Sequence, residues 1–217
     1  MNLDAIQKRW LAPAEIHREA DELRQKHCPA GEIPIDSLLM AEDMGIYLDE
    51  VADLYRLVGS PGCISMSGQE ILIDLDVFRK PNMENRLRFT VAHELGHVVL
   101  HRDLFTYLRK EAAGSVQRWN DLMIEYQRHS LSSTYEWQAN EFAGRLLVPP
   151  QSLALALQPA FDELRRRKIH PSVFTVEQIA AFVAPQICER FKVAEKTMRI
   201  RIEKESIVKT MLEEWSF

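Results

Sequence analysis

The sequence predicts an α+β fold, with a helical core, a small antiparallel β-sheet and extra helices at both ends. Segments with apolar residues at helical spacing fill most of the 217 residues. Two short apolar runs flank a Ser-Gly-Gln turn, and proline or glycine marks the ends of several segments. Because 46% of the residues are hydrophobic, the chain can bury a core of its own.

Two helices are expected ahead of the sheet. Pro13 suits the first turn of a helix, since the N–H that proline lacks has no partner there. This helix should end before the turn at 29–31. Asp36 can cap a second, short helix, and Gly45 can end it in a left-handed conformation.

The sheet and a long helix are expected next. Residues 46–48 look extended, and the apolar runs 63–66 and 71–75 predict a β-hairpin. Pro81 then opens a helix at about 83–101, with an apolar stripe along one side. This helix carries the residues with the clearest chemistry.

The rest of the chain is expected to be helical. Residues 103–134 predict one or two helices, which could pack on the core or form a lid over an active site. Their apolar set is Trp119, Leu122, Met123 and Tyr126. Further helices are predicted at 135–147, 152–168, 176–183, 185–191 and 195–212.

Charge and cysteine content exclude several classes of protein. A net charge of −5 argues against a protein that coats nucleic acid without specificity. Cys28, Cys63 and Cys188 lie far apart and are odd in number, so no disulfide framework is expected. The sequence shows neither a signal peptide nor an apolar run long enough for a membrane helix. We therefore expect a cytoplasmic protein with no membrane partner.

The segment HELGH predicts a metal site. His93 and His97 are four residues apart, so their side chains share one helix face and can both reach one zinc ion at about 2.0–2.1 Å. Glu94 lies beside them, where it can take a proton from water as a general base. The surrounding stretch is apolar, and polar groups buried there need strong partners.

A catalytic zinc needs a third protein ligand, and two candidates stand out. His101 continues the histidine row, but a straight helix carries it about 6 Å further along the axis. An orienting role or a surface position suits His101 better. Glu136 begins a later helix, with Asn140 one turn on to orient a ligand by a hydrogen bond. From spacing alone, Glu136 could equally be an exposed acid at a helix start.

Two segments, RFTVAHELGHVVLH and EWQANEFAGRLLVPP, resemble the ImmA/IrrE family of metallo-endopeptidases, over roughly residues 31–155. The resemblance implies a zincin-like, gluzincin-type zinc site, with His93, His97 and Glu136 as ligands and Glu94 as general base. It also implies cleavage of a protein substrate, a helix-turn-helix transcriptional repressor. The long segment 103–134 departs from the family pattern.

The sequence suggests three parts of the chain. They are an N-terminal helical segment at 1–30, a zincin-like metallopeptidase domain at 31–168, and a small helical C-terminal module, helix-turn-helix-like, at 169–217. In the last part, 186–201 could present Lys196, Arg199 and Arg201 to DNA. Packing or partner docking is the favoured role for this module, and direct DNA binding the less favoured one.

Other residues are candidates for assisting the reaction. Arg88 could orient substrate, although a structural role, pairing with an acid on the sheet, is favoured. Tyr135, Tyr126, His101 and His129 could each donate the hydrogen bond that a tetrahedral intermediate requires. The leading hypothesis is a zinc-dependent endopeptidase. The alternatives are a zinc-bound docking or sensor protein that does not cleave its partner, and a DNA-binding regulator.

Overall fold

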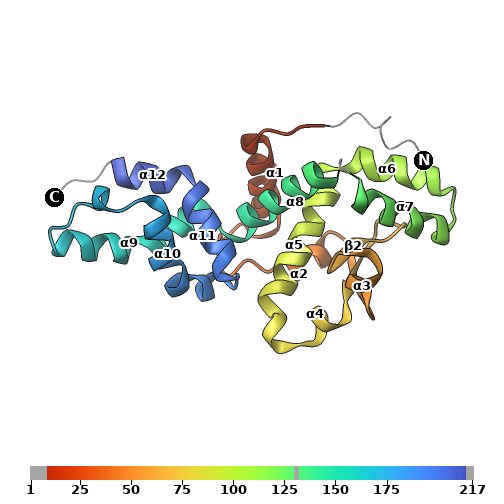
Figure 1. Ribbon diagram of the computed structural model, residues 1–217, viewed down its shortest axis with the longest axis horizontal. Helices are drawn as coiled ribbons and strands as arrows, with labels where there is room; N and C mark the ends of the chain where they lie inside the picture. The colour runs from red at the N-terminus through yellow and green to blue at the C-terminus, as the bar shows by residue number, and fades with distance from the viewer. Residues whose placement is uncertain (1–8, 130–131, 214–217) are drawn as a thin grey trace.

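The computed structural model describes residues 9–129 and 132–213. Figure 1 shows helices α9 to α12 at one end of the molecule and α6 and α7 at the other, with α1, α5 and α8 between them. In chain order the elements are α1 (Pro13–His27), α2 (Ser37–Asp43), β1 (Tyr47–Val51), α3 (Leu54–Val58), β2 (Gly62–Ile64), β3 (Glu70–Asp74), α4 (Leu75–Arg79), η2 (Pro81–Met83), α5 (Glu84–Leu100), α6 (Arg102–Ala112), α7 (Val116–Arg128), α8 (Ser132–Leu147), α9 (Pro150–Arg166), η3 (Pro171–Val173), α10 (Val176–Ile187), η4 (Cys188–Phe191), α11 (Glu195–Lys204) and α12 (Ser206–Glu213).

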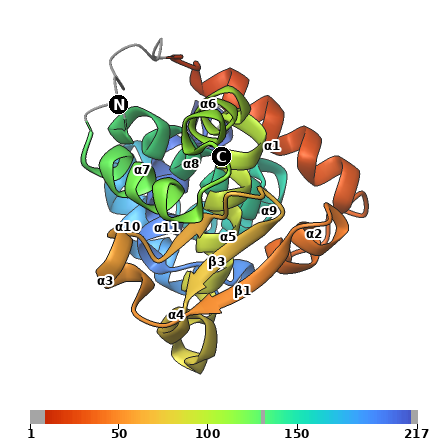
Figure 2. The ribbon, with the colours of Figure 1, turned by 90° about the vertical axis from the view of Figure 1, so that its right-hand side faces the viewer.

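The α+β class is confirmed, but the sheet is mixed rather than antiparallel. β2 and β3 form the predicted antiparallel hairpin, with Cys63 opposite Leu72. β1 pairs with the other edge of β3 in parallel, with Tyr47 opposite Glu70, so that the strand order is β1-β3-β2. The chain between β1 and β2 contains α3 and crosses to the far edge of the sheet, which places β3 in the middle (Figure 2).

Helices α5 and α8 pack against each other at the centre of the molecule. Gly96 of α5 allows their close approach, because a Cβ atom at that position would lie 3.1 Å from Phe142 Cδ1 and 3.3 Å from the backbone of Ala139. The two predicted motif segments therefore meet along this helix pair. The small residues at the contact set the distance between them.

The predicted helical segment 103–134 contains two helices, α6 and α7, that pack on a second hydrophobic cluster. Trp119, Leu122, Met123 and Tyr126 are all buried in it. The cluster also contains Cys63 and Ile64 of β2 and Tyr135 of α8. The apolar face of α7 is thus part of a core, as the packing alternative predicted.

Replacing Trp119 with alanine should lower the free energy of unfolding by about 3–5 kcal/mol, the usual cost of removing a large buried aromatic side chain. Val116 provides a matched control on the same helix, because it is 60% exposed. Val116→Ala should change stability by less than about 0.5 kcal/mol. Denaturant unfolding of both variants measures the difference, and equal stabilities would contradict the packing role of α7.

Buried charges fix the C-terminal helices to the central pair. Arg201 of α11 is only 1% exposed and donates hydrogen bonds to Glu141 of α8 and to Glu205. Arg145 of α8 donates to Glu205 at 2.8 Å and to Asp21 of α1 at 2.6 Å. This network joins α1, α8 and α11. Because Arg201 is enclosed, it is not available to contact DNA, in contrast to the proposed presentation of this side chain.

The helix boundaries at the C-terminal end differ from prediction at two places. A single helix, α10, runs through Pro185 to Ile187 where a break was expected. Ala181, whose carbonyl loses its partner at this proline, is exposed and can be hydrated. The predicted helix 195–212 is interrupted at Glu205, whose backbone is extended. At residue 169, where the C-terminal module was expected to begin, side chains from both sides of the boundary share one hydrophobic cluster.

No helix in the described part of the chain is long and apolar enough to cross a membrane. All three cysteines are free thiols, and Cys63 is buried.

Candidate metal centre

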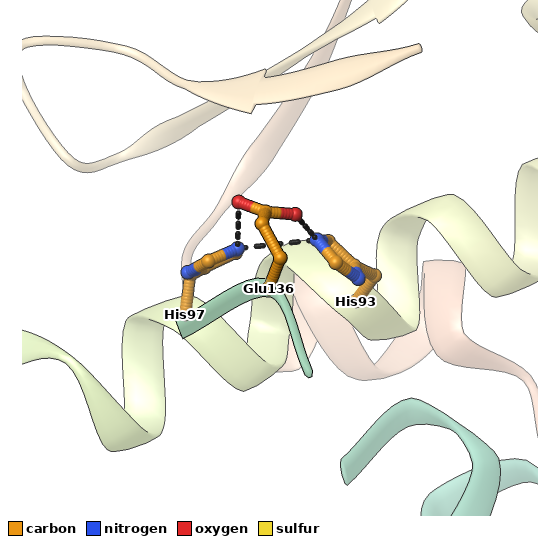
Figure 3. A group of neighbouring side chains, drawn as sticks. All are labelled: His93, His97 and Glu136. Carbon is orange, nitrogen blue, oxygen red and sulfur yellow. Dashed lines mark hydrogen bonds and ion pairs between the residues drawn. The ribbon is translucent and has the colours of Figure 1, made fainter. Parts of the chain in front are cut away.

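Two histidines of α5 and a glutamate of α8 converge at the centre of the molecule. His93 Nε2 lies 3.0 Å from Glu136 Oε2, and His97 Nε2 lies 3.3 Å from Glu136 Oε1. The two Nε2 atoms are 3.1 Å apart. Figure 3 shows the two imidazole rings and the carboxylate pointing toward one another. The structure therefore brings together the three residues that the sequence suggested as ligands.

A hydrogen bond at Nδ1 of His93, on the side of the ring away from Glu136, determines which ring nitrogen carries the proton. His93 Nδ1 lies 3.2 Å from Asn140 Oδ1, one helical turn beyond Glu136 on α8. An amide oxygen is only an acceptor, so Nδ1 carries the proton and donates it. When the ring is neutral, its lone pair is then on Nε2, directed at Glu136. Asn140 therefore has the orienting contact that its spacing suggested.

A chain of hydrogen bonds determines in the same way which ring nitrogen of His97 carries the proton. Gln138 donates to the carbonyl oxygen of Arg9 at 3.0 Å, which leaves its own side-chain oxygen to accept from His101 Nε2 at 2.8 Å. Burial and the neighbouring His97 lower the pKa of His101 to about 3, so its ring is neutral. His101 Nδ1 is then an acceptor, and His97 Nδ1 donates to it over 2.9 Å. His97 Nε2 also carries a lone pair.

With both rings neutral, the converging atoms all carry lone pairs, an arrangement that suits a cation among them. Glu136 Oε1 is buried and accepts no hydrogen bond within the described residues. Ligand atoms about 2.0–2.1 Å from a tetrahedral zinc ion are about 3.3–3.4 Å apart, close to the spacings seen here. Burial alone would raise the pKa of Glu136, but the close approach of His93 and His97 outweighs burial and holds this pKa well below its usual range, so that Glu136 is a carboxylate. The donor set fits zinc.

Glu94 lies beside this group and against β2. A Cβ atom on Gly62 would be 3.3 Å from Glu94 Oε1 and 2.6 Å from Thr90 Cγ2, so glycine is needed for the strand to approach α5 here. Burial raises the pKa of Glu94, while the charges of His93 and His97 lower it, and burial dominates. A buried carboxyl with a raised pKa is suited to accept and return a proton.

A model of a peptidase family described as the IrrE N-terminal-like domain matches residues 79–203, more than half of the chain. The chain belongs to this family. Membership of the IrrE N-terminal-like family confirms the resemblance and supports a metallopeptidase-type function. The match includes both motif segments, but it begins after the sheet and extends into α11, whereas the resemblance covered residues 31–155. Comparisons with curated proteins and with solved structures gave no significant match.

The other suggested residues lie around the centre rather than in it. Arg88 donates to the carbonyl oxygen of Ile35 at 3.3 Å and lies 3.6 Å from Asp36, the capping residue of α2. Its second acid partner is Glu84 of α5, at 3.4 Å. These surroundings fit the favoured structural role, although neither acid is on the sheet. Tyr135 accepts a hydrogen bond from the backbone of Arg9 at 3.4 Å. The hydroxyl of Tyr126 is buried and has no partner within the described residues.

Sequence reasoning gave no role to Gln138, which links the N-terminal segment to His101. It is fully buried, between Glu136 and Asn140 in the chain. A polar side chain inside an otherwise buried helix face could have indicated a partner, but only the fold brings His101 of α5 next to it. The hydrogen-bond chain through Gln138 sets which nitrogen of His97 is free.

Replacing Gln138 with leucine should weaken metal binding about 10–100-fold, because His101 would lose the acceptor that fixes its ring and, through it, the orientation of His97. Competition with a chelator measures this affinity. Gln158 is the matched control, since it lies on α9 and bonds only to Asp162 on the surface. Equal affinities in Gln138→Leu and Gln158→Leu would contradict the orienting role.

Proposed function

We propose that the protein is a zinc-dependent endopeptidase. The observation that carries this proposal is the convergence of three metal-ligand atoms, from His93, His97 and Glu136, beside the buried carboxyl group of Glu94. Membership of a peptidase family supports the same reaction class. The metal is proposed to be zinc because two imidazoles and one carboxylate are the protein ligands of many catalytic zinc sites, which keep one position open.

In this proposal His93, His97 and Glu136 hold the ion, while Asn140 and His101 hold the imidazole rings in place. Bound zinc supplies Lewis acidity, which acidifies water and polarises a peptide carbonyl. Glu94 takes the proton from the attacking water at its carboxylate and gives it to the amine that leaves. Its burial against Gly62 keeps the carboxyl group beside the reacting atoms and away from bulk solvent.

The substrate is proposed to bind as an extended segment along β2. The backbone bonds from Ser65 to Glu70 and from Asp74 to Pro61 place alternate residues of this strand toward β3. The N–H and C=O groups of Gly62 and Ile64 therefore face the other edge, which pairs with no strand among the described residues. A segment added at this edge would pass close to Glu94, which lies against Gly62.

The proposed substrate is a helix-turn-helix repressor, in a cytoplasmic setting, as the family resemblance implied. The test is incubation of the purified, zinc-loaded protein with the helix-turn-helix repressor encoded nearest to its gene, followed by mass spectrometry of the products. We expect cleavage at one internal bond, and no cleavage after zinc removal by a chelator. A zinc-loaded protein that binds this repressor without cutting it would support the docking alternative instead.

A further inference from the structure

A pocket of about 280 Å³ opens directly beside His97. Its walls come from three elements that the proposed reaction does not otherwise use together. The β2–β3 hairpin contributes Ile64 and Gly68, α5 contributes His97, and α6 contributes Arg102 and Arg109. Because the pocket shares a residue with the metal centre, a side chain that enters it belongs to a substrate residue within one or two positions of the scissile bond, at about 3.3 Å per residue.

The two arginines of this pocket have no acidic partner among the described residues. Arg102 and Arg109 are seven residues apart on α6, so they project from the same face of the helix. Neither forms an ion pair or hydrogen bond with any described residue, unlike Arg88 or Arg145 elsewhere in the molecule. Arg109 is half-buried, and its Nε atom is fully enclosed without a hydrogen-bond partner. Cations that line a pocket and have no acidic partner among the described residues can bind an anion that enters it.

The hairpin turn holds Arg109 in place. Gly68 has a φ of +73°, and a Cβ atom there would lie 3.0 Å from Arg109 Cζ and closer still to one of its terminal nitrogens. The guanidinium group therefore packs directly against the turn, and any residue larger than glycine at position 68 would disturb this contact. Contact with the turn limits the conformations of Arg109 before a substrate arrives, and so reduces the entropy lost on binding.

We propose that Arg102 and Arg109 form a subsite for an acidic side chain of the substrate, and so select an aspartate or glutamate next to the cleaved bond. Guanidinium groups bind carboxylates through paired, charge-assisted hydrogen bonds. Thr106, one turn from Arg102, also lines the pocket and adds a hydroxyl group, while Ile64 forms an apolar wall for the methylene groups. The subsite rests on the proposed endopeptidase function and specifies the chemistry of its substrate.

The experiment uses the full-length, zinc-loaded protein and a mixed library of peptides with acetylated N-termini and amidated C-termini, so that every carboxylate is a side chain. Mass spectrometry of the products gives the residue preference at each position. We expect aspartate or glutamate to be favoured over asparagine or glutamine by about tenfold or more at one position within two residues of the cut. Arg102→Glu should abolish this preference and favour lysine or arginine there, and Arg109→Gln should reduce it.

Arg118→Glu on α7 is the matched control, because it makes the same charge change at an exposed arginine outside the pocket. It should keep the wild-type preference, and zinc content and melting temperature check that all variants fold. Cleavage without an acidic preference, or a preference unchanged in Arg102→Glu, would overturn the subsite but not the peptidase. If the wild-type protein cuts neither the library nor any repressor, the proposed function fails and the subsite with it.

Discussion

Replacing Glu94 with glutamine should reduce the rate of peptide cleavage about 10²–10⁴-fold while zinc remains bound. The amide has nearly the shape of the carboxylate but cannot accept the proton of the attacking water, and loss of a general base typically costs this much. His93, His97 and Glu136 are unchanged in this variant, and none of their hydrogen bonds within the described residues involves Glu94. The site should therefore hold its metal without catalysis.

The measurement is the rate of cleavage of one peptide by wild type and Glu94→Gln, each with its zinc content determined on the same sample. Glu125→Gln provides the matched control, since Glu125 is exposed on α7 and outside the site. It should cleave at the wild-type rate. A Glu94→Gln protein that retains zinc and also retains more than a tenth of the activity would assign the proton transfer to another group.

Replacing Arg201 with methionine should lower the free energy of unfolding by up to about 3–5 kcal/mol, because removal of one partner from a buried ion network leaves the remaining charges only partly compensated. Glu141 and Glu205, the two partners of Arg201, are 5% and 1% exposed. Glu141 would keep Lys204, and Glu205 would keep Arg145, each at 2.8 Å. Gly144, whose Cβ would lie 2.9 Å from Arg201 Cδ, leaves the room that this side chain occupies.

Arg199 gives the comparison on the same helix. It is 44% exposed and lies 3.9 Å from Glu195, so Arg199→Met should cost less than about 1 kcal/mol. Denaturant unfolding of both variants measures the difference. Equal stabilities would mean that the network contributes little. Tight, salt-sensitive DNA binding by the wild type that is lost in Arg199→Met would revive the nucleic-acid alternative, since exposed cations of α11 would then contact phosphates.

Local sequence patterns were sufficient for much of the fold. Asp36 does cap α2, with its carboxylate accepting from the backbone of Leu38 and Leu39, and Pro13 does begin α1. The hairpin formed as the turn at 67–69 predicted, because both its strands are adjacent in the chain. The parallel pairing of β1 with β3 has no such local signal. It depends on a crossover through α3, and no turn sequence specifies which edge of the sheet the chain joins.

In the candidate site, too, local sequence places some of the residues, and only the packing of the fold places the others. His93, Glu94 and His97 share one helix, so spacing alone places them together. The position of Glu136 could not be decided by spacing, since an acid at a helix start is usually exposed, and only the packing of α8 on α5 turns it toward the histidines. Gln138 gave only a weak signal, as a polar side chain on a buried helix face, and Arg102 and Arg109 gave none. Their importance depends on which groups from other elements they meet, or fail to meet, after folding.

The most direct test of the account is the zinc content of the purified protein and of Glu136→Ala, measured by elemental analysis after exposure to excess zinc and gel filtration. We expect about one zinc per chain in the wild type and in the surface control Glu125→Ala, and a large loss in Glu136→Ala, because two imidazoles alone leave a catalytic site one protein ligand short. A wild-type protein without zinc, or a Glu136→Ala protein with a full equivalent, would contradict the proposed metal centre.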